Sequence, residues 1–377
     1  MRRALFDPEH DFFRDTVRRY FETEFLPRNA EWEAAGEVSR EAWREMGRQG
    51  WLCTLIPEEY GGAGVDERYA AILLEEQYRL GLTGPGWSLH SDIIAPYLLN
   101  YGTEEQKREW LPRMASGEAI AAIGMTEPSG GSDVKALRAT ARRDGNGYVL
   151  NGQKTFISNG WTADLVVVAA KTDPSAGARG VSLFLVDTSL PGFRKGRKLE
   201  KIGTHAADTA ELFFDDVRLP GSALLGEEGR GFGMLMANLP WERLIIAINT
   251  VAVAEAAMGW ALAHVKQRQA FGGTLFDLQN TRFQLARCAT DIEVGHAFVD
   301  RCLTAQIAKE LTPEEGAMAK LWGTEMQDRV LDICLQLHGG YGYMKEYPIS
   351  RLWADSRYQR IAGGASEVML EIVGRSL

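Results

Sequence analysis

The sequence contains no run of about 18 apolar residues, so it predicts no membrane-spanning helix. It also has no apolar core of a secretory signal, because the basic start Met1-Arg2-Arg3 is followed within a few residues by acidic side chains. Cysteine is scarce, and the four that occur form no C-x-x-C pair. We therefore expect a cytoplasmic protein with reduced core thiols at Cys53, Cys288, Cys302 and Cys334.

Several motifs that mark known kinds of site are missing. There is no G-x-x-x-x-G-K-[ST] segment, so no P-loop is predicted, and no G-x-G-x-x-G lies between a strand and a helix, so a Rossmann dinucleotide site is unsupported. The six histidines show no metal-ligand spacing, and no metal site is expected. The G-x-S-x-G nucleophile elbow is absent as well. If the protein is an enzyme, we expect its chemistry to depend on a cofactor that is held in another way.

What is present is the composition of an ordinary globular protein, with 45% hydrophobic and 25% charged residues. A chain of 377 residues is long enough for two or three domains. The 51 acidic residues outnumber the 42 basic ones, and the resulting net charge of −9 argues against nucleic acid as a partner.

The first third of the chain has the pattern of amphipathic helices. Apolar residues recur every three or four positions from Phe13 to Phe25, interrupted only by Glu24. Thr103 and Gln106 have the spacing of a capping box, in which each side chain bonds the backbone amide of the other residue. This predicts a helix that starts there and stops near Gly117. We expect a helical N-terminal domain over residues 1–118.

The middle of the chain has the pattern of β-strands. Residues 165–170 and, apart from Ser182, residues 181–186 are apolar runs that suit buried strands. The segment Asp144-Gly145-Asn146-Gly147 predicts a hairpin turn, and Leu212-Phe213-Phe214 predicts a further strand. We expect a small β domain over residues 119–225.

From about Gly229 the chain returns to helix. Residues 244–267, 278–309 and 314–337 are rich in alanine, leucine and isoleucine and predict a C-terminal helical bundle over residues 226–377. The order of helices, then strands, then helices indicates an α+β fold that is mostly α.

The most informative segment is Met125–Asp133, which reads Met-Thr-Glu-Pro-Ser-Gly-Gly-Ser-Asp. Glycines and hydroxyls packed this closely let backbone amides approach a flat or phosphorylated ligand. Taken alone, the segment fits an ordinary surface turn equally well. A second glycine-bounded segment, Asn151–Gly160, adds an aromatic side chain and a hydroxyl.

With three later segments, these two form an ordered set that resembles the acyl-CoA dehydrogenases, the FAD enzymes that desaturate acyl-CoA thioesters. The resemblance covers nearly the whole chain, and residues 199–226 and 239–246 look most similar to the long-chain branch. It implies a middle antiparallel β-barrel or sandwich, a C-terminal four-helix bundle and a homotetramer built as a dimer of dimers. The three later segments are Arg268–Gly272, Gln336–Gly342 and Ile361–Met369.

The resemblance implies two groups of FAD contacts. In the first, Phe156 covers one face of the flavin and Ser158 hydrogen-bonds its reactive edge. In the second, Arg268 meets the pyrophosphate of the FAD in the neighbouring subunit. Two of these residues also have plain structural interpretations, Arg268 as a surface charge late in a helix and Phe271 as a core aromatic. The expected cofactor contacts are Met125, Thr126, Gly131, Ser132, Phe156, Ile157, Ser158, Arg268, Phe271, Gln279, Gln336, Gly339, Gly340, Ala365 and Glu367.

The implied reaction needs a base that takes a proton from Cα while a hydride leaves Cβ for the flavin. A carboxylate in an apolar slot suits this task, because desolvation raises its pKa. The family carries the base either in the closing loop, where this chain has Gly363, or early in the first long helix after the β domain. Glu242 fits the second position and precedes the apolar run 244–248. The alternative for Glu242 is a helix-start glutamate paired with an arginine.

Further roles follow from the same resemblance. The backbone amide of Gly363 is expected to stabilise the enolate oxygen, and electrons are expected to pass to electron-transfer flavoprotein. Two positions depart from the family pattern, since Ala365 stands where threonine is usual and Glu367 where some relatives have glutamine. The expected substrate contacts are Ser132, Arg243 and Gly364.

Three other functions fit parts of the sequence. The acyl group could be carried by a carrier protein instead of CoA, as in some relatives. The same fold also supports flavin oxidases and monooxygenases, although the larger oxidases usually add a C-terminal helical domain. A non-catalytic acyl-CoA-binding protein is favoured by the missing closing-loop carboxylate and opposed by Glu242.

Overall fold

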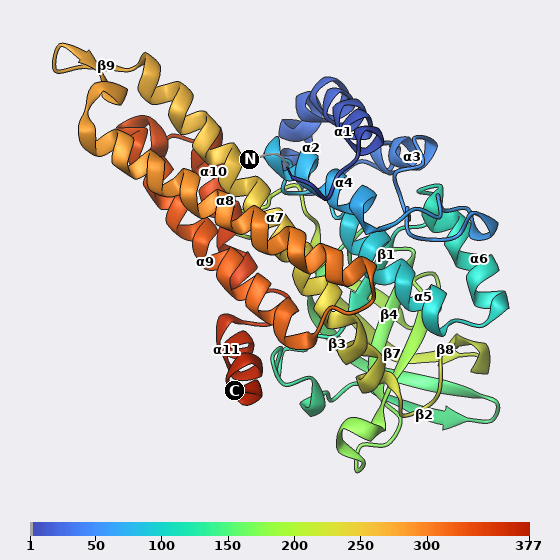
Figure 1. The fold of residues 1–377 in the computed structure, drawn as a ribbon. Helices are drawn as coiled ribbons and strands as arrows, with labels where there is room; N and C mark the ends of the chain where they lie inside the picture. Colours follow the sequence, from blue (N-terminus) through green and yellow to red (C-terminus); the bar gives the residue numbers. More distant parts are fainter. Residues whose placement is uncertain (1–2) are drawn as a thin grey trace.

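The computed structural model describes residues 3–377, so the first two residues of the predicted N-terminal domain lie outside it. Figure 1 shows N-terminal helices beside a β-sheet, with an elongated bundle of C-terminal helices running past both. This order of elements confirms the predicted α+β fold that is mostly α. All four cysteines are buried and form no disulfide bond, as predicted.

The N-terminal part is helical, as its apolar pattern predicts. The stripe is buried at Val17, Phe21 and Phe25, and the last two belong to a π-helical turn that continues the first helix. The capping box is confirmed, since the Thr103 amide donates to Gln106 Oε1 at 2.9 Å. The helices are α1 (Pro8–Tyr20), α2 (Asn29–Ala35), α3 (Arg40–Arg48), α4 (Glu67–Arg79), α5 (Ala95–Tyr101) and α6 (Glu104–Ala115), with a second π-helical turn, η4 (Leu89–Ile94), before α5.

The middle part is one sheet with the strand order β6-β7-β3-β2-β4-β5-β8, and β1 lies beside β4. Most neighbours are antiparallel, but β1 runs parallel to β4. The predicted hairpin is confirmed by the antiparallel pairing of Asp144 with Gly147. The strands are β1 (Ala121–Gly124), β2 (Thr140–Asp144), β3 (Gly147–Ser158), β4 (Leu165–Lys171), β5 (Val181–Asp187), β6 (Phe193–Lys198), β7 (Thr209–Leu219) and β8 (Leu224–Leu225).

Strand β4 explains why its sequence is continuously apolar. Its side chains alternate between two cores: Val167 packs in the core shared with the N-terminal helices, and Val166 packs in the core of the β domain itself. Both faces of the strand are therefore buried, and neither needs polar residues.

The C-terminal part contains three long helices, and a shorter fourth helix, α10, packs against two of them. The first long helix begins at Gly231, close to the predicted return to helix at about Gly229, and has Pro240 inside it. The elements are α7 (Gly231–Gln267), β9 (Gln269–Ala270), β10 (Gly273–Thr274), α8 (Gln279–Ile307), α9 (Pro313–Leu337), α10 (Pro348–Ser356) and α11 (Ser366–Ser376).

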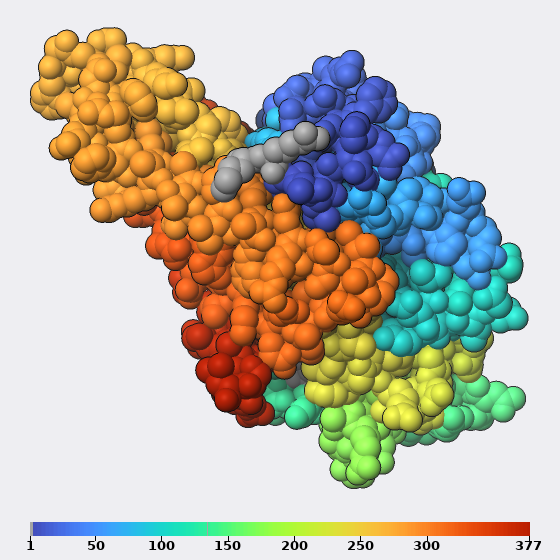
Figure 2. Space-filling view, in the orientation of Figure 1, coloured from blue at the N-terminus to red at the C-terminus, as the bar shows by residue number. Residues whose placement is uncertain are grey.

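Helix α7 is long and apolar enough to cross a membrane by composition, because an 18-residue window within it has a mean hydropathy of 1.6. However, 72% of that window is buried inside the protein. In Figure 2 most of the middle of α7 lies behind α8 and the N-terminal helices. Its hydrophobicity is therefore that of a core helix.

Helices α7 and α9 approach each other closely because α9 carries glycines where they meet. A Cβ added to Gly316 would lie 2.8 Å from the Pro240 carbonyl oxygen, and one added to Gly323 would lie 2.6 Å from Thr250 Oγ1. These two contacts hold the stretch of α7 from Pro240 to Thr250 close to α9.

A chain of buried ion pairs joins the N-terminal helices to the bundle. Glu75 on α4 receives Arg3 and Arg14, each at 2.5 Å. Arg79 on the same helix pairs with Glu255 on α7 at 2.6 Å. Burial alone would raise the pKa of Glu75, but Arg3 and Arg14 outweigh it and lower that pKa from 4.5 to about 2.

This pKa predicts part of the acid stability. Because the folded-state pKa of Glu75 is depressed, its contribution is present above pH 4.5 and is lost as the pH falls towards 2. We expect Glu75→Gln to lower the free energy of unfolding at pH 7 by about 3 kcal/mol and to flatten its decline below pH 4.5. Denaturant unfolding at a series of pH values measures this. Glu41→Gln, which removes an exposed carboxylate paired with Arg48, is the control and is expected to change neither.

Candidate active site

Glu242 lies inside the protein, on the face of α7 that meets α5. Glu242 is only 6% exposed. The Tyr97 hydroxyl donates a hydrogen bond to Glu242 Oε1 at 2.9 Å. The helix-start alternative is wrong, because α7 begins at Gly231 and Glu242 lies well inside the helix. The next residue back, Trp241, anchors the same turn by donating its indole N–H to the Asp92 carbonyl at 2.9 Å.

Burial raises the pKa of Glu242 from 4.5 to about 7, while the hydrogen bond from Tyr97 and the charge of Arg243 act in the opposite direction. A carboxyl with this pKa is partly ionised at neutral pH and can take up or release a proton there. The position has the electrostatics that general-base catalysis requires.

Arg243 is also buried, at 5% exposed. Its Nε has no hydrogen-bond partner among residues 3–377. Burial lowers the pKa of its guanidinium, against the opposing effect of Glu242. A buried donor without a partner is costly, so this side chain is suited to meet a ligand.

The predicted closing loop reaches α7 beside Glu242. Gly363 has a φ of +65°, and a Cβ added to it would lie 2.4 Å from Cδ1 of Ile246, which is one helical turn beyond Glu242. The loop therefore presents backbone, and no side chain, to this part of the helix. The next carbonyl, that of Gly364, accepts a hydrogen bond from Lys320 Nζ at 2.6 Å.

The two glycine-bounded segments, 125–133 and 151–160, are joined to each other. The buried Lys154 on β3 donates to the Met125 carbonyl at 3.1 Å and to Glu127 Oε1 at 2.8 Å. The Thr155 amide donates to the Thr126 carbonyl at 2.9 Å. Burial would raise the pKa of Glu127, but Lys154 and backbone amides lower it below its usual value. The ion pair thus fixes the loop against the strand.

Phe156 lies at an irregularity of β3. The register of β3 with β7 shifts between Lys154 and Ile157, and Phe156 adopts a φ of +58° there. As a result Phe156 is 68% exposed, while Ile157 turns into the core. The predicted residues Gly131, Ser132 and Ser158 are exposed as well.

The other predicted cofactor residues lie at the far end of the bundle, near the β9 hairpin in Figure 1. Arg268 ends α7, and its guanidinium lies 5.6 Å from the centroid of the Tyr341 ring. Phe271 is 93% exposed, so its interpretation as a core aromatic is wrong. The predicted cofactor residues at this end are all exposed: Arg268, Phe271, Gln279, Gln336, Gly339 and Gly340.

Within one chain Arg268 lies far from Glu242. Arg268 follows Glu242 by 26 residues along α7, which corresponds to about 39 Å at about 1.5 Å per residue. The structure therefore brings Glu242 and Gly363 together but does not bring Arg268 to them.

Sequence reasoning missed three residues of this region. Tyr97 and Lys320 lie far along the chain from the groups they bond, and no local pattern marks them. Ser366 follows Ala365 at the start of α11, and its hydroxyl is buried with no partner among residues 3–377. Its position in the closing segment, directly after the expected flavin contact Ala365 and before the exposed Glu367, was the available signal.

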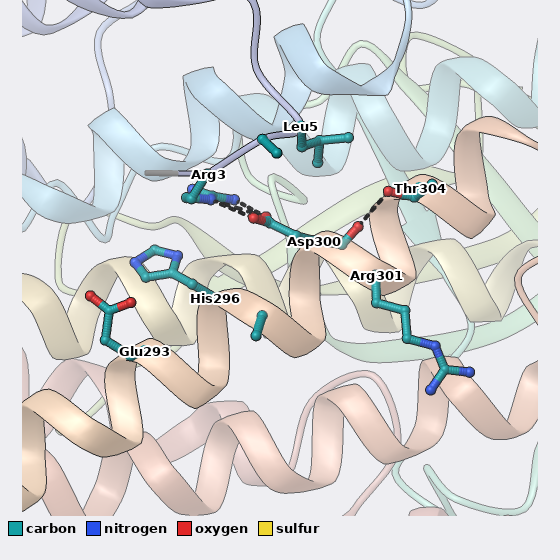
Figure 3. Close-up of a pocket in the computed structure, with 9 residues that line it drawn as sticks. Arg3, Leu5, Glu293, His296, Asp300, Arg301 and Thr304 are labelled. Carbon is teal, nitrogen blue, oxygen red and sulfur yellow. Dashed lines mark hydrogen bonds and ion pairs between the residues drawn. The ribbon is translucent and has the colours of Figure 1, made fainter. Parts of the chain in front are cut away.

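A hollow of about 520 Å³ lies elsewhere, between the start of the chain and α8. Figure 3 shows Arg3 pointing across to the carboxylate of Asp300, with which it forms an ion pair. His296, also in the lining, bonds Glu255 at 2.7 Å. Glu255 follows Glu242 by 13 residues on α7, about 20 Å along the helix, so the hollow is separate from the Glu242 region.

Comparisons with known proteins agree over the whole chain. Family models of the acyl-CoA dehydrogenase N-terminal, middle and C-terminal domains match residues 7–118, 122–217 and 229–377. The long-chain specific acyl-CoA dehydrogenase of Sus scrofa mitochondria is 51% identical over 377 residues, which cover 100% of this chain and 88% of that protein. An acyl-CoA dehydrogenase from Bacillus subtilis is 35% identical and covers 98% of each chain.

Solved structures give the same result. The crystal structure of an acyl-CoA dehydrogenase from Geobacillus kaustophilus has a TM-score of 0.97, 46% identity and 99% coverage of both chains. A glutaryl-CoA dehydrogenase from Mycobacterium smegmatis, in complex with FADH2, has a TM-score of 0.93 and 30% identity, with 99% of this chain and 95% of that chain covered. These likenesses confirm the resemblance drawn from the sequence motifs. The chain belongs to the acyl-CoA dehydrogenase family and is an oxidoreductase that acts on a CH–CH bond of acyl-CoA thioesters.

Proposed function

We propose that Glu242 takes the α-proton when the enzyme converts an acyl-CoA thioester to its trans-2-enoyl product. The observation that carries this is a buried carboxyl whose pKa is raised to about 7, beside a closing loop that offers only backbone. Burial keeps competing water away, and Tyr97 holds the carboxyl through one oxygen, which leaves the other for the substrate. Gly363 cannot provide the base itself, because it has no side chain.

Negative charge develops on the thioester oxygen as the α-proton leaves. We propose that the amide of Gly363 stabilises this charge, since one such donor in a site that excludes water contributes about 3–4 kcal/mol. Arg243, whose buried Nε has no partner within residues 3–377, is proposed to contact the substrate together with Ser132 and the backbone of Gly364. FAD, when bound, accepts the hydride that leaves Cβ.

The described residues fit FAD. The exposed ring of Phe156 and the exposed residues 129–133 offer a surface for a flat ligand. At the far end of the bundle, a Cβ added to Gly339 or Gly340 would meet nothing within 4 Å, so a ligand has room to approach the backbone beside Arg268. Arg268 supplies the planar donor fork that suits a pyrophosphate.

The separation of about 39 Å between Glu242 and Arg268 supports sharing of each FAD between two chains. We propose that one chain supplies the residues around the flavin and its partner supplies Arg268, Phe271, Gln279, Gln336, Gly339 and Gly340. This makes at least a dimer necessary for cofactor retention. We extend the proposal to a homotetramer, a dimer of dimers, held through the C-terminal helices.

The relatives support a specific substrate and acceptor. The mitochondrial relatives of pig, mouse and rat, at 49–51% identity, are named for long-chain substrates, and we propose a long acyl chain here as well. We propose electron-transfer flavoprotein as the electron acceptor. We also propose that the protein works in a reducing compartment, the cytoplasm, in keeping with the four free thiols. Turnover of a CoA series from butyryl to stearoyl, with isovaleryl included, tests the chain length.

The alternatives to CoA chemistry have direct tests. Anaerobic bleaching of the bound flavin by acyl-CoA, compared with the same acyl group on a carrier protein, distinguishes the two thioesters. Rapid reoxidation of the reduced flavin in air would favour an oxidase.

Replacing the proposed base is expected to stop turnover. Glu242→Gln should lower kcat by about 10²- to 10⁴-fold while the purified protein stays yellow, because the amide cannot accept the proton. In the wild type, kcat/KM should rise with pH through about 7, where Glu242 ionises, and this limb should be absent from the variant. Steady-state assays over pH 5–9 measure both.

Asp92→Asn is the matched control for this change. Asp92 is also a buried carboxyl whose pKa burial raises to about 7, but its side chain does not bond Tyr97. We expect kcat of this variant to stay within about threefold of wild type, because the change leaves the Glu242 carboxyl, its hydrogen bond from Tyr97 and the backbone carbonyl of residue 92 intact. Full turnover of Glu242→Gln with flavin retained would remove the base assignment.

Tyr97 is expected to set the working pH. Its hydrogen bond favours the ionised form of Glu242, so Tyr97→Phe should raise the pKa of that carboxyl. The acidic limb of kcat/KM should move upward by about one to two pH units, since a hydrogen bond to a charged group is worth about 1.5–3 kcal/mol. An unshifted limb would mean that another group titrates. Tyr101→Phe, one helical turn away and without a bond to Glu242, is the control.

Sharing of FAD predicts complementation between two inactive variants. In a heterodimer of Glu242→Gln with Arg268→Ala, one site has both lesions, and the other combines an intact Glu242 with an intact Arg268. We expect each variant alone to be inactive or to lose FAD, and the co-expressed heterodimer to recover up to about half of wild-type activity per FAD site. Activity and flavin content of doubly tagged heterodimers measure this. Absence of any recovery in heterodimers that contain FAD contradicts the sharing.

A further inference from the structure

Lys320 on α9 is a buried lysine, whereas most lysines are exposed to solvent or paired with a carboxylate. The residue is 0% exposed, and within residues 3–377 its ammonium forms no ion pair. Its side-chain hydrogen bond runs to a backbone oxygen, the carbonyl of Gly364, at 2.6 Å. Lysines are almost never fully buried without a compensating partner, so this cation at a helix–helix contact needs an explanation.

The neighbouring charges do not supply one. Burial, followed by the nearby cations Arg243 and Arg360, lowers the pKa of Lys320 to about 8, and Glu367 acts in the opposite sense. The site therefore disfavours the ammonium electrostatically, and the feature that favours it is the strong hydrogen bond to the loop carbonyl.

The backbone geometry places Lys320 where α9 and α7 are closest. Gly316 and Gly323, at which an added Cβ would clash with Pro240 and Thr250, lie four residues before and three residues after it. Positions at this spacing share one face of a helix. The lysine stem thus starts between two fixed points of contact, at the level of Arg243 on α7, and its end has little freedom to move.

The closing loop needs such a support. Gly363 and Gly364 both have positive φ, at +65° and +99°, and neither has a side chain with which to bind the helices. Ile246 of α7 packs against the first of these glycines, and the ammonium of Lys320 holds the second from α9.

We propose that Lys320 is a positioning residue for the dehydrogenation: through the Gly364 carbonyl it holds the closing loop so that the Gly363 amide faces the thioester oxygen beside Glu242. The inference rests on the roles proposed above for Gly363 and Glu242. Lys320 itself does not touch the reacting atoms.

The test compares FAD-loaded wild type with Lys320→Met, which keeps the apolar stem and removes the donor. A loop that is misplaced by about 1 Å can cost about 10²-fold in rate, so kcat should fall about 10- to 100-fold while KM changes less than about threefold. A second readout uses a 3-thiaacyl-CoA, which loses an α-proton but cannot be dehydrogenated. Its enolate forms a charge-transfer complex with oxidised flavin, which gives a long-wavelength absorption band. This charge-transfer band should be weaker at pH 7 in the variant than in the wild type.

Two further variants make the result specific. Thr324→Val, one turn further along α9, is equally buried and loses only hydrogen bonds to the backbone of its own helix, so it should behave as wild type. Lys320→Gln retains a donor and should lie between wild type and Lys320→Met. If the methionine variant does not load FAD, the glutamine variant takes its place in the comparison.

The outcomes separate the two proposals. If Glu242→Gln is inactive while the Lys320 variants keep wild-type kcat and a wild-type enolate band, only the Lys320 proposal fails. An equal loss in Thr324→Val also overturns it, because the effect would then belong to the packing of α9. If Glu242→Gln keeps full turnover, the base assignment fails whatever the Lys320 variants show.

Discussion

The site depends on one steric constraint, the contact of Ile246 with a glycine of the closing loop. Because the space in which a Cβ of residue 363 would lie is filled by Cδ1 of Ile246, this loop cannot carry a side chain there without a shift of the helix side chain. A carboxylate is instead found one turn earlier on α7, at Glu242. The closing loop thus supplies backbone to the site, and helix α7 supplies the carboxyl.

Burial gives the carboxyl its chemistry and also creates a cost that the surroundings offset. A carboxyl without water disfavours its ionised form, which raises the pKa of Glu242, and Tyr97 and Arg243 limit the rise. The same enclosed region contains the cations Arg243 and Lys320. Such a concentration of buried charge costs stability, and it contrasts with the buried Glu75, which is directly paired with Arg3 and Arg14.

The long helix α7 connects the parts of the molecule. It carries Glu242 in its first third and is capped by Arg268 at its C-terminal end, and its ion pair through Glu255 ties it to α4. A rigid helix of this length keeps Glu242 and Arg268 apart within one chain. The proposed sharing of FAD between two chains would couple assembly to catalysis.

Much was determined by the sequence itself, because local patterns report local structure. The apolar run of β4, the Asp144–Gly147 turn, the capping box at Thr103 and the long helices follow from short-range preferences, and all are found. The ordered motifs identified the family. The apolar run that follows Glu242 predicted that this carboxyl is buried and has a functional role.

Only the tertiary structure decided what surrounds that carboxyl. Tyr97 lies 145 residues from Glu242, and Lys320 lies 44 residues from Gly364. No periodicity could pair them, because such contacts arise from how helices pack and not from neighbouring residues in the chain. The sequence indicates which side chains are candidates for the site. Packing determines the partners, the exposure and the pKa values of those side chains.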